Sequence, residues 1–113
     1  MARRNLAPVL ADILDAIAGI EAATTGKSFS DYTNDWLLRR GVERGLEIIS
    51  EAARRLPESA TDSHPEIPWK QVRGVGNLLR HEYHKIADQI VWAVVTDHLT
   101  PLKLAILDIQ EAV

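Results

Sequence analysis

Apolar residues recur at every third or fourth position in four segments of the chain, and no segment alternates apolar and polar residues with a period of two. The first two apolar series are Leu6, Val9, Leu10, Ile13, Leu14, Ile17 and Ile20, then Leu38, Val42, Leu46, Ile49, Ala53 and Leu56. Such spacing places the apolar side chains on one face of a helix. The pattern therefore predicts an all-α fold.

Local signals give the ends of the first two helices. We expect Asn5 to cap the first helix and Thr24 to Gly26 to end it, because Asn caps helix starts and Gly follows helix ends. The polar stretch that follows offers Ser30 or Asp31 as the next cap. The second helix should then run without interruption until just before Pro57.

The second half of the chain predicts two further helical regions. The stretch "PESATDSHPEIP" is rich in Pro, Ser, Asp and Thr and indicates a loop. Pro68 then begins a third helix, because proline is tolerated in a first turn. The last helical region spans 86–113, with a kink or break expected at Pro101.

Gly41 and Gly45 lie one turn apart inside the second predicted helix. Each glycine costs about 1 kcal/mol in helix propensity relative to alanine. We therefore expect a packed neighbour to approach the backbone closely at both positions.

The four regions predict an up-and-down bundle of four to five helices, in a single domain over residues 1–113. The apolar stripes are broad for so small a bundle, and Trp36, Trp69 and Trp92 are available to pack. A homodimer would bury the excess apolar surface.

Composition limits the chemistry that the chain can perform. It has no cysteine, which fits a reducing cytoplasm and excludes thiolate metal sites and cysteine nucleophiles. Its formal net charge of -3 means that phosphate binding must depend on a local cluster of cations. Asp12 and Asp15 interrupt the first apolar run, so we expect no signal peptide. No stretch approaches about 18 uncharged apolar residues, so we expect no membrane span.

Polar groups concentrate in "RGVGNLLRHEYH", residues 73–84. On a helical wheel Asn77, His81 and His84 form a stripe opposite the apolar face, with Arg73 and Arg80 at its flanks. Imidazole can give or take a proton near neutral pH, and guanidinium groups can neutralise a phosphoryl oxygen. These groups fit phosphodiester cleavage by a ribose 2′-hydroxyl, with a second histidine supplied across a dimer.

Gly74 and Gly76 remove side-chain bulk beside this stripe, so a partner helix or a substrate phosphate could come close.

Other interpretations of the same residues stay open. A solvated helix surface explains the stripe equally simply, and Tyr83 on the apolar side fits a core aromatic residue. His64, in a proline-bounded loop, and His98, near Pro101, are expected to be structural. His81 and His84 lack an evident third metal ligand, so no metal site is predicted, and no dinucleotide fingerprint is present, so no cofactor is expected.

Three phrases carry a resemblance to a known family: "GLEIISEAARRLP", "HPEIPWKQVRGVGNLLRHEYHKI" and "IVWAVVTDHLTPLK". Together they resemble the HepT-like branch of the HEPN superfamily, the toxin halves of prokaryotic toxin–antitoxin pairs. The resemblance runs from about Leu6 to Leu107 and implies a helical homodimer that cleaves RNA without a metal in a cleft between protomers. It also implies a partner resembling a minimal nucleotidyltransferase, which silences the toxin by adenylylating a tyrosine.

The family motif is an arginine followed after four to six residues by His-any-Tyr. By this resemblance His81 is the motif histidine, Tyr83 the motif tyrosine and adenylylation site, and Asn77 the polar residue that follows the arginine. The motif arginine is missing, because the place before Asn77 is Gly76. Either Arg73 or Arg80 takes the cationic role from a neighbouring position, or nuclease activity is weak or lost.

Two functional hypotheses follow. The first is a cytoplasmic ribonuclease toxin with His81, Asn77, Tyr83 and Arg73 or Arg80 at its site. The second is a non-catalytic helical module that binds the nucleotidyltransferase or a nucleotide. A purely structural helical dimer is a third possibility.

Overall fold

The fold is built from four long helical segments and two short helices. The computed structural model describes residues 5–81 and 84–113, and within them all regular structure is helical, which confirms the all-α prediction. The long segments are α1 (Ala7–Thr24), α3 (Trp36–Ala53), α5 (Trp69–His81) and a C-terminal run made of α6 (His84–Ala93), a π-helical turn (Val94–His98) and α7 (Leu99–Ala112). The short helices are α2 (Phe29–Thr33) and α4 (Glu58–Asp62).

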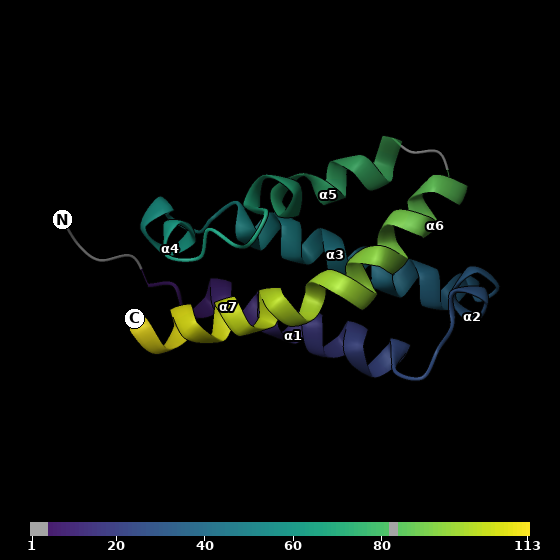
Figure 1. Cartoon of the computed structure of the whole chain (residues 1–113), viewed down its shortest axis with the longest axis horizontal. Coiled ribbons are helices and arrows are strands. Elements are labelled where there is room, and N and C mark those ends of the chain that lie inside the picture. Colours follow the sequence, from purple (N-terminus) through teal and green to yellow (C-terminus); the bar gives the residue numbers. More distant parts are fainter. Residues whose placement is uncertain (1–4, 82–83) are drawn as a thin grey trace.

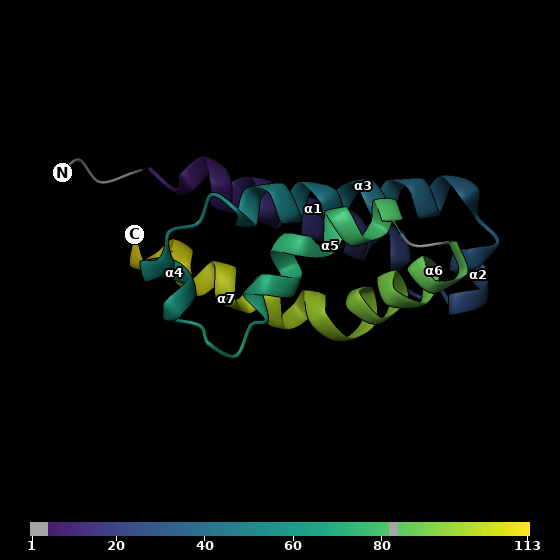
Figure 2. The ribbon, with the colours of Figure 1, turned by 90° about the horizontal axis from the view of Figure 1, so that it is seen from above.

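Helix α3 is the centre of the bundle. It packs against α1 on one side and α5 on the other, and α7 lies along α1 (Figure 1). Seen from above, α5 crosses the space between α3 and the C-terminal run (Figure 2). This arrangement places the end of α5 beside α3 and α6.

One apolar core joins the long helices. Most of the large side chains with the least exposure come from the apolar series that the sequence displays, and Tyr32 of α2 joins them. Those from the series include Leu10, Ile13, Ile17, Leu46, Ile49, Val91 and Ile106. Burying a side chain of this size contributes about 1.5–3 kcal/mol. The 3.6-residue periodicity therefore identified the faces that hold the bundle together.

The two glycines of α3 have different surroundings. A Cβ added at Gly45 would lie 2.8 Å from both Cδ1 and Cγ1 of Ile20, so α1 and α3 approach closely there and the prediction is confirmed. A Cβ added at Gly41 would meet nothing within 4 Å, so the expected close approach is wrong at that position. Gly41 faces an open part of the α1–α3 groove.

This contrast predicts opposite effects of the same substitution. Gly41→Ala should stabilise the fold by about 0.5–1 kcal/mol, because alanine favours helix and the space is open. Gly45→Ala should not stabilise it and is expected to cost up to about 2 kcal/mol, because overpacking against buried Ile20 outweighs the gain in propensity. Urea unfolding of the two variants measures the difference, and equal stabilisation by both would contradict the packing described here.

The connection between α1 and α3 differs from the prediction. Asn5 is not the cap of α1 as predicted, because Leu6 occupies the N-cap position without a side-chain cap bond. Asn5 lies one residue earlier and accepts a hydrogen bond from the Ala7 N–H (3.0 Å). Neither Ser30 nor Asp31 caps the next long helix, because residues 29–33 form the separate helix α2. Its cap is Ser28, which forms a reciprocal capping box with Asp31.

These bonds lower the pKa of the Asp31 carboxyl, chiefly through the backbone N–H of Ser28. Asp35 caps α3 by accepting from the Leu38 N–H (3.0 Å).

The expected irregularity near Pro101 is present, just before the proline. The Leu99 N–H donates to the carbonyl of Val94, a π-type bond five residues back, and Pro101 is the third residue of α7. Proline has no N–H, so it fits best in the first turn of a helix. The π-helical turn ends directly before α7, which places Pro101 in the first turn of α7. The segment predicted to be a loop after Pro57 holds the short helix α4, so that prediction is partly wrong.

A continuous helical run, Ala87–Ala112, is long and apolar enough to cross a membrane when judged by length and composition alone, with a mean hydropathy of 1.4. Core helices of soluble proteins meet the same criteria, and this run buries Leu99, Leu102, Ile106 and Ile109 in the bundle core. The expectation of no membrane span stays a prediction.

The three tryptophans differ in burial. Trp69 is buried and donates its indole N–H to the His64 carbonyl (3.0 Å), and Trp92 packs on Tyr32 with ring centroids 5.3 Å apart. Trp36 is 64% exposed, next to Leu37, which is 73% exposed. The described residues therefore leave two large apolar side chains uncovered at the start of α3.

Candidate functional site

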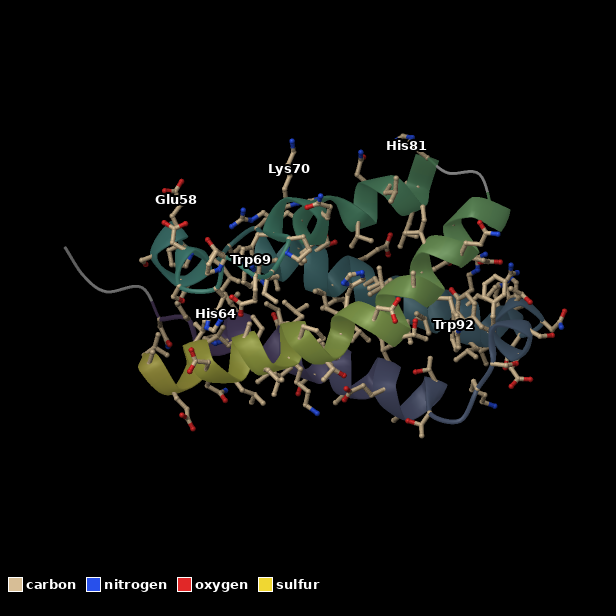
Figure 3. The ribbon with its side chains drawn as sticks, in the orientation of Figure 1. Glu58, His64, Trp69, Lys70, His81 and Trp92 are labelled. Carbon is tan, nitrogen blue, oxygen red and sulfur yellow. The ribbon has the colours of Figure 1, made fainter. Side chains whose placement is uncertain are left out.

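His81 is the last residue of α5 and is exposed to solvent. Figure 3 shows it at the end of α5, on the same outer side as Lys70. Asn77 lies one turn earlier and is also exposed, while Val75 and Gly76 are buried on the opposite side. The predicted polar stripe is therefore present over Asn77 and His81, where an imidazole and an amide can meet the same substrate.

The predicted continuation of the stripe to His84 stays a prediction. Helix α5 is described up to His81 and α6 from His84 onward, and the side chain of His84 lies outside what the structure describes. Tyr83, the predicted motif tyrosine and adenylylation site, lies outside the described residues.

Arg73 is directed toward the end of α3. Its Nε donates to the Ala53 carbonyl (3.4 Å), and its own carbonyl accepts from Ser50 Oγ (2.6 Å) and Arg54 Nε (3.1 Å). It also lies eight residues before His81, which is about 12 Å along a helix axis. Arg73 therefore joins α5 to α3, and this geometry favours Arg80 as the cation near His81.

Arg80 is exposed and directly precedes His81. Its Nη1 lies 3.8 Å from Glu47 Oε2 of α3, a loose ion pair. It also lines a cavity of about 300 Å³ where α3, α5 and α6 meet. The described residues that line this cavity are Arg40, Glu43, Arg44, Glu47, Leu79, Arg80 and Ala87.

Sequence reasoning missed the two arginines that α3 contributes to this cavity. Arg40 and Arg44 are four residues apart, which places them on one helical face. That spacing was a signal available in the sequence. Nothing in the sequence connected this face to α5, because only tertiary packing brings the two helices together.

The glycines of α5 also differ in surroundings. A Cβ added at Gly76 would lie 3.6 Å from Ser50 Oγ and 3.8 Å from Glu47 Cα, so this glycine faces α3. A Cβ at Gly74 would meet nothing within 4 Å, and Gly74 is exposed. Of the two, Gly74 is the one that leaves open space on the solvent side of the helix.

His64 holds the segment before α5 against α7. Its Nδ1 lies 2.9 Å from Glu66 Oε2 and its Nε2 lies 2.8 Å from Asp108 Oδ2. The bond to Glu66, and then that to Asp108, raises the pKa of His64, and the same pair lowers the pKa of Glu66. His64 is therefore structural, as expected. His98 is exposed at the end of the π-helical turn.

The contacts of His64 with Glu66 and Asp108 predict that stability depends on pH. A raised histidine pKa gives stability that is fully present below the unfolded pKa of about 6.5 and is lost as pH rises through the folded value. The lowered pKa of Glu66 adds stability that is lost in acid. As pH rises from 5 to 9, the free energy of unfolding should fall more steeply for the unsubstituted protein than for His64→Gln. Parallel curves would contradict a charged His64 paired with Glu66 and Asp108.

Within residues 5–81 and 84–113, no group of three or more His, Cys, Asp or Glu side chains is arranged to hold a metal ion. The expectation of no metal or cofactor stays a prediction.

Comparisons with known proteins agree on one family. Residues 13–109 match the family described as "Ribonuclease HepT-like". The chain is 34% identical over 101 residues to a proposed ribonuclease HepT of Thermococcus cleftensis, covering 89% of this chain and 92% of that protein. It is 32% identical over 104 residues to a proposed RNase of Caldanaerobacter subterraneus subsp. tengcongensis, covering 92% and 93% of the two chains.

A proposed RNase of Methanocaldococcus jannaschii is 30% identical over 103 residues, covering 91% of this chain and 94% of that one. No solved structure gives a significant match. The family match covers most of the chain, and the relatives match over nearly their full length. The chain therefore belongs to the HepT-like ribonuclease family.

Proposed function

We propose that this protein is a ribonuclease that cleaves RNA by attack of a ribose 2′-hydroxyl on its own phosphodiester, without a metal ion. The observation that carries the proposal is the exposed imidazole of His81 at the end of α5, beside Arg80 and one turn from Asn77, in a chain of this family. We also propose that residues 1–113 form a single domain and that the protein acts in the cytoplasm.

The chemistry needs a base, an acid and positive charge. His81 takes the proton from the 2′-hydroxyl as the bond from O2′ to phosphorus forms and the bond from phosphorus to O5′ breaks. The leaving O5′ receives a proton, and the products carry a 2′,3′-cyclic phosphate and a 5′-hydroxyl. Guanidinium groups neutralise the charge that grows on the phosphoryl oxygens.

A homodimer completes the site in this proposal. The attacking and leaving oxygens lie on opposite sides of phosphorus, so one histidine cannot easily serve both, and a second protomer supplies another. The exposed Trp36, Leu37 and Leu104, and an apolar groove of about 720 Å³ between α5 and the C-terminal run, supply surface for association. Light scattering on the purified protein should give twice the monomer mass.

In the cell we propose a toxin–antitoxin role. A nucleotidyltransferase partner would silence the nuclease by adenylylating Tyr83, in line with the family resemblance. Intact mass of the protein co-expressed with its neighbouring gene should then rise by one adenylyl group, and Tyr83→Phe should remove that increase.

A non-catalytic binding module is the second candidate. The observation that favours it is Gly76, which stands where the family motif has its arginine. Incubating purified protein with total RNA and a chelator separates the two candidates. The nuclease proposal expects fragments that accumulate with time and protein concentration, whereas intact RNA at every concentration supports the binding module.

A further inference from the structure

The cavity between α3, α5 and α6 gathers guanidinium groups from two helices. Its described lining carries three arginines, Arg40, Arg44 and Arg80, against two carboxylates, Glu43 and Glu47. The described lining is therefore positive by one charge, within a chain whose net charge is -3. A local excess of this kind attracts anions where the protein as a whole does not.

The ion pairs inside the cavity leave the arginines only partly satisfied. Arg40 Nη1 lies 3.1 Å from Glu43 Oε1. Arg44 and Arg80 share Glu47 at the longer distances of 3.6 and 3.8 Å, and Arg44 Nη1 also lies 3.9 Å from Glu51 Oε1. Arg40 Nε is buried and has no hydrogen-bond acceptor among the described residues. Buried donors are normally paired, and arginine pairs best with planar or tetrahedral oxyanions.

Gly76 lies at the contact of α5 with α3, next to a residue of this cavity. It is four residues before Arg80, on the same side of α5, and its nearest neighbours across the interface are Ser50 and Glu47. Glu47 also lines the cavity, and Arg80, which lines it from α5, directly precedes His81.

We propose that Arg40, Arg44 and Arg80 form a binding site for a backbone phosphate of single-stranded RNA, adjacent to the phosphodiester on which His81 acts. This inference depends on the proposed ribonuclease function and names the cations that serve it. Glu47 competes with the phosphate for Arg44 and Arg80, so RNA must displace a carboxylate to bind. Arg40 and Arg44 of α3 then supply part of the positive charge that an arginine at position 76 would give.

Binding to a 2′-O-methyl RNA oligonucleotide tests the proposal without cleavage. Arg44→Ala and Arg80→Ala should each weaken binding about 10-fold and lower the slope of log Kd against log salt by about 0.7, the value for one phosphate contact on a single strand. Arg55→Ala is the matched control, because Arg55 is similarly exposed and pairs with Asp12 (3.3 Å) outside the cavity. It should change binding less than about 2-fold.

Glu47→Gln distinguishes phosphate binding from a purely structural role. If the arginines bind phosphate, removing their competing carboxylate should tighten oligonucleotide binding about 3-fold or more. If they only tie α5 to α3, the same variant should lower the unfolding free energy and leave binding unchanged, which would overturn the proposal. Circular dichroism and urea unfolding of each variant show whether the fold is retained.

Three outcomes separate this proposal from the function on which it depends. No binding of the oligonucleotide by the unsubstituted protein overturns both. Binding that Arg44→Ala, Arg80→Ala and Arg55→Ala weaken equally overturns the cavity site and leaves the nuclease intact. If Arg44→Ala and Arg80→Ala weaken binding of AMP or inorganic phosphate but not of the oligonucleotide, the site holds a free nucleotide or phosphate ion and the RNA assignment is overturned.

Discussion

His81→Ala should reduce the rate of RNA cleavage by at least about 100-fold, and up to about 10⁴-fold, which is the range expected when a general base is removed. His81 is exposed at the end of α5 and contributes nothing to the described core, so the fold should be unaffected. The measurement is the initial rate of cleavage of a labelled single-stranded RNA in the presence of a chelator. His98→Ala removes an exposed imidazole elsewhere and serves as the control.

Equal cleavage rates for His81→Ala, His98→Ala and the unsubstituted protein would show that another residue acts as the base.

Gly76→Arg should raise the cleavage rate about 10-fold or more, because it restores a guanidinium where the family motif has one. One hydrogen-bond donor that stabilises the transition state is typically worth about 10²–10³ in rate. The new side chain can begin without a clash, since its Cβ would sit at ordinary contact distance from Ser50 and Glu47. Glu47, which borders this position, also lines the cavity together with Arg80.

Gly74→Arg is the matched control for this gain. It adds the same charge to the same helix at an exposed position with open space. If the two variants raise the rate equally, the added charge only attracts RNA, and position 76 has no special role. If Gly76→Arg alone raises the rate, the absence of the motif arginine limits the natural protein.

The sequence predicted most of the fold because burial in a helical bundle follows periodicity. The apolar series of α1 and α3 became the core, and the helix ends near Gly26 and Pro57 were within a few residues of those observed. Short connections were predicted less well. A five-residue helix such as α2 or α4 has too few turns to give a periodic signal. Helix α2 was therefore missed, and two residues inside it, Ser30 and Asp31, were offered as the cap of the next long helix.

The candidate site was predicted only where it is local in sequence. Asn77 and His81 share one helical face and were found from their spacing. The turning of Arg73 toward Ala53 and the approach of Arg40 and Arg44 both depend on how α5 packs against α3. Spacing along one helix carries no information about a second helix about 30 residues away in the sequence.

The chemical nature of the cleaved ends tests the central claim most directly. RNA fragments produced by the purified protein in chelator should be analysed by mass spectrometry. Attack by the 2′-hydroxyl predicts 2′,3′-cyclic phosphate and 5′-hydroxyl ends, and no product from the same oligonucleotide made with 2′-deoxyribose. Fragments with 3′-hydroxyl and 5′-phosphate ends, or cleavage of the deoxyribose substrate, would contradict the mechanism assigned to His81.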